Sequence, residues 1–197
     1  IPVPQIGPCQ VLVRVAATSV NPVDWKIRKF APPLGPEMPA VLHGDVAGGV
    51  EAVGADVRDF AVGAEVYGCA GGVKGTGGAL AEFMACDADF LAPKPSNLSM
   101  VEAAALPLVC LTAWEGLVDG ANVGQGQTVL VHAGAGGVGH VATQIAIARG
   151  ATVYATVSGP EKAAAVSEFG ATPINYREHS VEDYVATHTG GAGFDIV

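Results

Sequence analysis

The pattern of apolar and polar positions changes character near residue 97. Before that point, short apolar runs alternate with glycine and proline. Runs of this length, bounded by turn residues, are typical of β-strands. We therefore expect a compact all-β unit over residues 1–97. Its strands are expected within VLVRVAATSV (11–20), DVAGGVEAVG (45–54), AEVYGCAGG (64–72) and AEFMACDADFLA (81–92).

From residue 98 onward, segments with helical spacing alternate with short apolar runs. Ser99 and Glu102 form the S-x-x-E pattern of a capping box, which predicts a helix to about Leu117. Repeated β-α units of this length require a parallel, doubly wound sheet over residues 98–197. Strands are expected at 127–132, 151–157 and 172–175, helices at 137–149, 160–169 and 180–188, and a further strand start at FDIV (194–197).

The two ends of the chain predict a fragment. The opening segment IPVPQIGPCQVLVRV is typical of the second strand of a unit already begun, and Val197 lies inside a predicted strand. A doubly wound dinucleotide fold has about six strands, of which four are visible here. We expect a truncated piece to bind its cofactor weakly and to expose an unpaired sheet edge.

The segment VLVHAGAGGVGHVATQIA (129–146) carries the most specific local signal. Gly134, Gly136 and Gly139 form a G-x-G-x-x-G pattern between a predicted strand and a predicted helix. We expect the first glycine to allow chain reversal, the second to allow approach of a pyrophosphate, and the third to allow close helix–strand packing. The helix start would then present N–H groups and its positive dipole end to the phosphates.

Composition and charge narrow the class of partners. The net charge of −9 and the pI near 4.8 argue against nucleic acid or an anionic membrane. The four cysteines form no C-x-x-C pair, so we expect a reducing cytoplasm. Residues 120–148 carry no charged side chain, but their seven glycines favour a buried strand and helix over a membrane span.

Several ordered motifs together resemble the medium-chain dehydrogenase/reductase superfamily, most closely its zinc-independent quinone oxidoreductase branch. The motifs are NPVDWKIR (21–28), GDVAGGVEAVG (44–54), GGALAEF (77–83), ALPLVCLTAWEGL (105–117) and AGAGGVGHVATQIA (133–146). The resemblance implies a GroES-like catalytic domain over 1–97, lacking its first strand, and a partial NADP-binding Rossmann domain over 98–197. It also implies NADPH bound between the domains, a quinone or another activated alkene or carbonyl as substrate, and a homodimer at full length.

The same family resemblance implies that the protein has no catalytic zinc. Zinc-dependent relatives place ligands at positions held here by Asn21, Gly44 and Leu108, which cannot supply the three soft or imidazole ligands that such a site needs. His43 and Cys110 lie near these motifs but are out of register.

Val157 ends the second strand of the β-α-β unit without the carboxylate typical of NAD-specific folds. NADPH is therefore the expected cofactor. Glu161 is the competing acid, but Ser158 and Glu161 are expected to form a capping box with Pro160 in the first turn. The family pattern implies cofactor contacts from Thr112, Gly134, Gly136, Gly137, Val138, Gly139, Ser158, Lys162 and Tyr176.

Without a metal, the acceptor oxygen must be polarised by hydrogen bonds or by a proton donor. The first motif offers Asn21, Asp24 and Lys26 as candidate catalytic residues. Asp24 could instead cap a turn and Lys26 be solvated, and the Thr112 hydroxyl could be bonded within its helix. Lys162 could likewise be an ordinary solvated lysine. His132 and His140 are expected to be packing residues.

The expected activity is NADPH-dependent hydride transfer to a quinone or an activated alkene or carbonyl. A 2-enal or enoyl-thioester reductase on the same scaffold is one alternative, because the fold does not choose the substrate. An NADPH-binding protein without turnover, like the lens crystallins of this family, is the other.

Overall fold

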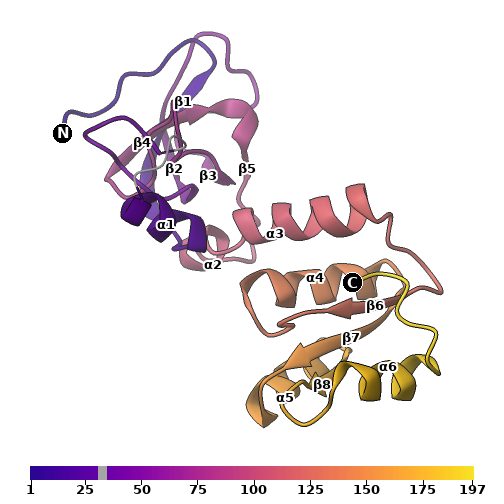
Figure 1. Ribbon diagram of the computed structural model, residues 1–197. Helices are drawn as coiled ribbons and strands as arrows, with labels where there is room; N and C mark the ends of the chain where they lie inside the picture. Colours follow the sequence, from indigo (N-terminus) through magenta and orange to yellow (C-terminus); the bar gives the residue numbers. More distant parts are fainter. Residues whose placement is uncertain (31–34) are drawn as a thin grey trace. The chain divides into compact units, whose positions relative to one another are not determined.

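The computed structural model describes residues 1–30 and 35–197 of the chain (Figure 1). It divides into two compact units, residues 1–108 and 109–197. The domain boundary expected at residues 97 and 98 lies ahead of helix α2 (Met100–Ala104). Ala103 and Ala104 of this helix are buried with Ala47 in one hydrophobic cluster, so the helix belongs to the first unit.

The first unit is built on a five-stranded antiparallel sheet in the order β4-β1-β2-β3-β5. The apolar runs predicted the all-β character of this unit and the approximate places of its strands, but not their order. Alternate side chains enter one core, so that Val11, Val13 and Val66 are fully buried. The elements are β1 (Gln10–Ala17), α1 (Pro22–Phe30), β2 (Asp45–Val53), β3 (Glu65–Cys69), β4 (Phe83–Asp87), η1 (Ala88–Phe90) and β5 (Leu91–Pro93).

The second unit holds a parallel sheet in the order β6-β7-β8 with helices on both faces. Its elements are β6 (Thr128–Val131), α4 (Gly137–Ala148), β7 (Thr152–Val157), α5 (Pro160–Glu168), β8 (Thr172–Asn175) and α6 (Val181–Thr189). Val129 and Val153 share a core with α4 and α5, whereas Leu130 and Tyr154 share one with Tyr184 of α6. Because neighbouring residues of a strand face opposite sides, the sheet is doubly wound, and the expected fold class is confirmed.

The last residues begin a fourth parallel strand beside β6. Ile196 pairs with Val129, and its carbonyl oxygen accepts a hydrogen bond of 2.9 Å from the Leu130 N–H. Its own N–H donates to the Thr128 carbonyl oxygen over 3.1 Å. The strand start expected at FDIV is therefore present.

The single helix expected from Ser99 to Leu117 is wrong. The capping box of Ser99 and Glu102 is present, but α2 ends at Ala104 and α3 (Pro107–Trp114) begins two residues after Ala105. Proline has no N–H and disfavours a helical residue before it, so Pro107 starts a new helix instead of continuing the old one. A π-helical segment, η2 (Glu115–Gly120), follows α3.

The capping box expected at Ser158 and Glu161 is also wrong. The N-cap of α5 is Gly159, with extended backbone and no side-chain cap, and Pro160 is the first helical residue. Within the described ranges, no helix combines the length and the apolarity needed to cross a bilayer.

Candidate functional site

The first unit contains a polar cluster around Asp45, the first residue of β2, which is fully buried. One carboxylate oxygen, Oδ2, accepts hydrogen bonds from the Ser19 hydroxyl (2.6 Å) and the Asn21 side-chain amide (2.8 Å). The other, Oδ1, accepts from the backbone N–H of Leu108 (2.9 Å). Three distant segments of this unit therefore meet at one carboxylate.

Asn21 and Asp24 lie together at the start of α1. The Asn21 backbone N–H donates to Asp24 Oδ2 over 2.6 Å, and the Asp24 N–H donates back to the Asn21 carbonyl oxygen over 3.0 Å. Both residues are buried, with exposed fractions of 7% and 3%. Asp24 thus caps the first turn of α1. The sequence allowed this role as the alternative to a catalytic one.

Lys26 lies on the opposite, exposed side of the same helix. Its Nζ lies 5.9 Å from the centroid of the Trp25 ring, and no described carboxylate forms an ion pair with it. The structure therefore brings Asn21 and Asp24 together with Asp45 and leaves Lys26 outside that network. The sequence did not identify Asp45 as a member of the site, because its hydrogen-bond donors lie in segments far apart in the chain.

The positions that hold zinc ligands in metal-dependent relatives are poorly suited to a metal here. A Cβ atom on Gly44 would lie 3.0 Å from the Gly71 carbonyl oxygen and 3.2 Å from Cys69 Sγ, so a histidine would force its neighbours to shift. Burial, followed by the nearby Asp45 carboxylate, raises the pKa of the Cys69 thiol from 9.0 to about 12. The described residues contain no group of three histidine, cysteine or acidic side chains arranged for a metal.

In the second unit, the three predicted glycines lie in the turn between β6 and α4. A Cβ atom on Gly134 would lie 2.5 Å from Ala155 Cβ, and one on Gly139 would lie 2.1 Å from the Ala133 carbonyl oxygen. The first glycine therefore allows packing against β7, and the third allows α4 to start close to the turn itself. The residue with left-handed backbone is Ala133, with φ of 53°.

Thr156 of β7 holds this turn in place. Its hydroxyl oxygen accepts a hydrogen bond from the Ala133 N–H over 2.9 Å, and its carbonyl oxygen accepts one from the Gly134 N–H over 3.0 Å. Thr156 is buried and lies in the middle of a strand pattern, so no sequence signal identified it.

The start of α4 is suited to an anion. Its N-cap is Gly136, which has no side chain, and no side-chain oxygen caps the helix. Gly137 and Val138, the first two helical residues, are exposed. The first N–H groups of a helix have no intrahelical acceptor and lie at its positive end, so these residues could hold a pyrophosphate.

The residues expected to contact a 2′-phosphate follow two adjacent strands. Val157 and Asn175 are paired in the sheet, and the Tyr176 N–H donates to the Val157 carbonyl oxygen over 3.2 Å. Ser158 and Tyr176 therefore leave the same edge of the sheet. Lys162 lies one turn into α5, exposed and without a described ion-pair partner.

Three further predicted residues have mixed outcomes. Thr112 lies in α3 with an exposed side chain, and its contact with a cofactor stays a prediction. His132 is exposed, so its expected packing in the core is wrong. His140 is half-buried, with Nδ1 3.1 Å from the Gly136 carbonyl oxygen and its ring 6.2 Å from that of Phe169, as expected for a packing residue.

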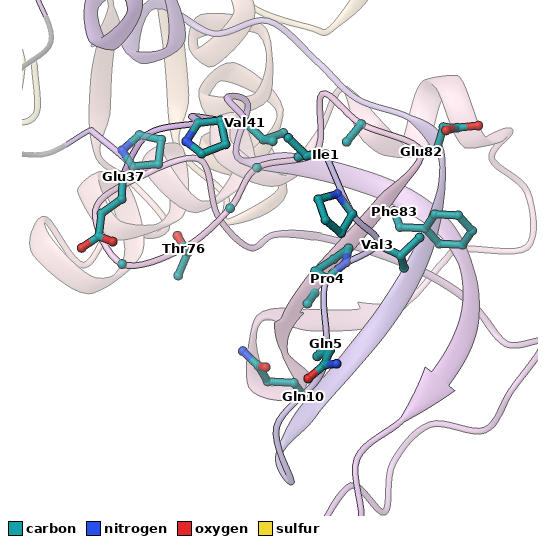
Figure 2. A pocket seen from close by; sticks show the side chains of 18 residues that line it. Ile1, Val3, Pro4, Gln5, Gln10, Glu37, Val41, Thr76, Glu82 and Phe83 are labelled. Atoms are coloured by element: carbon teal, nitrogen blue, oxygen red, sulfur yellow. The ribbon is translucent and has the colours of Figure 1, made fainter.

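Each unit has a hollow of its own. The hollow of the second unit has a volume of about 550 Å³ and is lined in part by Val157, Gly159 and Asn175, the neighbours of Ser158 and Tyr176. That of the first unit has a volume of about 710 Å³ and lies between the N-terminal segment and residues 75–78 (Figure 2). Its charged lining residues are the acids Glu37 and Glu82, and none of the predicted site residues lines it.

Residues 7–96 match the family described as "Alcohol dehydrogenase GroES-like domain", and residues 137–197 match the one described as "Zinc-binding dehydrogenase". The second match spans none of the three positions at which zinc ligands would be expected. The chain is similar to an alcohol dehydrogenase superfamily protein from Novosphingobium aromaticivorans, with 52% identity and a TM-score of 0.94 over 100% of this chain and 59% of that one.

It is also similar to the Escherichia coli quinone oxidoreductase solved in complex with NADPH, with 32% identity and a TM-score of 0.84 over 97% of this chain and 57% of that one. The chain belongs to the medium-chain dehydrogenase/reductase superfamily, in its quinone oxidoreductase-like branch. An "NADPH-dependent alkenal/one oxidoreductase, chloroplastic" from Arabidopsis thaliana is 41% identical over 92% of this chain and 48% of its own length. The chain spans about half the length of the curated relatives it matches.

Proposed function

We propose that the protein is an NADPH-dependent oxidoreductase that transfers hydride to a quinone or to an activated alkene or carbonyl, without catalytic zinc. The observation that carries this proposal is the β6–α4 turn, where Gly134 and Gly139 are sterically required and the helix start is uncapped. A dinucleotide pyrophosphate is the ligand that such a turn recognises in β-α-β units. The relatives named for NADPH-dependent alkenal/one reduction and for quinone reduction support the substrate class.

The preference for NADPH is argued from the ends of β7 and β8. No acid follows Val157 directly, and the Ser158 hydroxyl is not used as a helix cap. Ser158, Lys162 and Tyr176 together offer two hydroxyl groups and one ammonium group, which can bind a phosphate. The acid that would bond a ribose 2′-hydroxyl is missing from the end of β7, so this position itself adds no negative charge that would oppose a phosphate.

Substituting Lys162 by alanine tests this preference on the full-length protein. We expect the Kd for NADPH to rise about tenfold, because an exposed lysine–phosphate contact contributes roughly 1–2 kcal/mol. The Kd for NADH should stay unchanged, since NADH lacks the phosphate. Lys74→Ala, which removes an exposed lysine of the first unit, is the matched control. Equal weakening of both cofactors by Lys162→Ala would contradict the assignment.

Bound NADPH supplies the hydride, and this chain must supply the rest of the chemistry. The glycine turn and the start of α4 would hold the pyrophosphate and so set the position of the nicotinamide. Reduction of a quinone or enone also consumes a proton. Asn21 and Asp24 are committed to the Asp45 network and to the α1 cap, whereas Lys26 carries exposed protons. We therefore assign the proton donor, or the donor of a charge-assisted hydrogen bond, to Lys26.

The reaction is tested by following NADPH absorbance with a panel of quinones, enones and enals. Turnover with one of these classes is expected. Tight NADPH binding without oxidation by any acceptor would instead support a binding protein without turnover. Metal analysis of the active protein should find no stoichiometric zinc, and finding it would overturn the metal-free assignment. Light scattering of the full-length protein tests the homodimer that the family resemblance implies.

A further inference from the structure

Asp45 is a buried carboxylate that forms no ion pair with any cationic side chain among the described residues. The described ion pairs involve other residues, and His43 places its Nδ1 3.5 Å from the Thr18 hydroxyl oxygen. Thr18 in turn donates to the Asp45 backbone carbonyl oxygen over 2.7 Å. Burial of an ionised carboxylate is costly unless hydrogen bonds satisfy it. Asp45 therefore depends on its neutral donors, and each of them is held in a defined orientation.

Asn21 is the donor whose orientation matters most. Both of its side-chain N–H groups are used, one toward Asp45 Oδ2 at 2.8 Å and one toward Ser19 Oγ at 2.9 Å. Rotation of the amide by half a turn would place its oxygen against the Asp45 carboxylate. Two hydrogen-bond acceptors would then face each other and repel. Among the described residues, none donates a hydrogen bond to Asn21 Oδ1. This oxygen is also absent from the fully buried atoms that lack a partner, so part of its surface is accessible.

We propose that Asp45 is a positioning residue, which fixes the Asn21 amide so that Asn21 acts as a hydrogen-bond acceptor toward the bound ligand. The ligand group it selects is an O–H or N–H donor of the cofactor or of the electron acceptor. Asn21 does not polarise a substrate carbonyl, since it has no free N–H. The identity of the ligand rests on the proposed function, whereas the amide orientation rests on the hydrogen bonds alone.

Exchanging the hydrogen-bond donor and acceptor between positions 45 and 21 tests the proposal. In Asp45→Asn, the remaining oxygen at position 45 can still accept from the Leu108 N–H, so the new NH₂ group faces Ser19 and Asn21. Asn21 must then turn its oxygen inward and present N–H groups to the ligand. In Asn21→Asp, two carboxylates face each other. In the double variant Asp45→Asn/Asn21→Asp, the new amide donates to the new carboxylate, and position 21 again presents an oxygen.

These variants are made in the full-length protein, with Asp59→Asn as a control that makes the same change at an exposed site. Each single variant should lower binding or kcat/KM by about 10- to 100-fold, the range expected when a hydrogen-bonding group of the complex is left without its partner. The double variant should return to within about threefold of the wild type because the two changes couple. A folded double variant as impaired as the single ones overturns the proposal, since position 21 again presents an oxygen to the ligand in that variant.

Two readouts identify the source of the donor group. A change in the Kd for NADPH without any acceptor assigns the donor to the cofactor. A change confined to the KM of the acceptor, at saturating NADPH, assigns it to the substrate.

A measurement on the wild type keeps the proposal testable even where a variant does not fold. The side-chain NH₂ protons of Asn21 should exchange with solvent far more slowly than those of the exposed Asn97, because both are hydrogen-bonded. Equal exchange rates would refute the proposed orientation. A wild type that fails to bind NADPH, but shows slow Asn21 exchange, would contradict the proposed function and leave the orientation intact.

Discussion

Alanine substitutions in the β6–α4 turn should lower stability most at the glycines that have the least space for a Cβ atom. On Gly139, a Cβ atom would lie 2.1 Å from the Ala133 carbonyl oxygen and 2.8 Å from its carbon. On Gly134 it would lie 2.5 Å from Ala155 Cβ. On Gly136 the nearest atom is the Ala133 oxygen at 3.1 Å, and on Gly137 it is Val109 Cγ1 at 3.5 Å.

The magnitude follows from whether the neighbour can move. Overpacking a well-packed site costs about 1–3 kcal/mol. Gly139→Ala should reach or exceed about 3 kcal/mol because its neighbour is backbone, and that turn is held by two hydrogen bonds to Thr156. Gly134→Ala should cost about 2–3 kcal/mol, and Gly136→Ala about 1 kcal/mol. Gly137→Ala should be neutral or slightly stabilising, since its contact is an ordinary one and alanine favours a helix.

Thermal unfolding of the second unit, followed by circular dichroism, measures this order. At about 4–8 °C per kcal/mol for a unit of this size, Gly139→Ala should lower Tm by more than about 10 °C, while Gly137→Ala leaves it within about 3 °C. An NADPH titration of the same proteins shows whether Gly136→Ala weakens the cofactor more than its small stability loss explains. The same Tm for Gly139→Ala and Gly137→Ala would refute the steric argument.

Four further results are expected. Thr143→Val should raise the free energy of unfolding by about 1 kcal/mol, measured by chemical denaturation, because the fully buried Thr143 hydroxyl has no partner among the described residues; a loss of stability would show an undetected hydrogen bond. Burial raises the pKa of the Cys69 and Cys86 thiols from 9.0 to about 12, so at pH 8 iodoacetamide should label the exposed Cys9 well before either of them. The folded state keeps these two protons after the unfolded chain loses its own, so stability should fall as the pH rises from about 9 to about 12, and a flat profile would contradict the raised values. Lys26→Met should lower kcat by at least about tenfold with an unchanged Kd for NADPH, and an unchanged kcat would remove Lys26 as proton donor.

Local sequence patterns were sufficient to predict most of the helices and strands. The β-α alternation after residue 98 predicted β6, β7, β8 and their helices within one or two residues, because each element depends mainly on its own apolar periodicity. Where two local rules competed, the prediction failed. The apolar run after Ser99 favoured one long helix, but Pro107 divides it. The Ser158–Glu161 pattern favoured a capping box, but Gly159 begins α5 one residue later.

The glycine fingerprint shows how a correct prediction can rest on an incomplete reason. The pattern identified Gly134, Gly136 and Gly139 from their spacing alone. The spacing did not reveal that Gly134 makes room for Ala155, since that contact joins the turn after β6 to β7, and the whole of α4 lies between them in the chain. Steric requirements between elements are visible only when both elements are in place.

The sequence by itself determined the order of helices and strands and the dinucleotide fingerprint, because these depend on neighbours in the chain. It also determined which residues stand at the positions that hold zinc ligands in metal-dependent relatives. Only the tertiary structure decided what Asn21 can do. Its amide orientation depends on Asp45, and Asp45 in turn accepts hydrogen bonds from Ser19 and from the Leu108 N–H, 63 residues further along the chain. A buried carboxylate must collect its donors wherever the fold brings them, and no local pattern records that requirement.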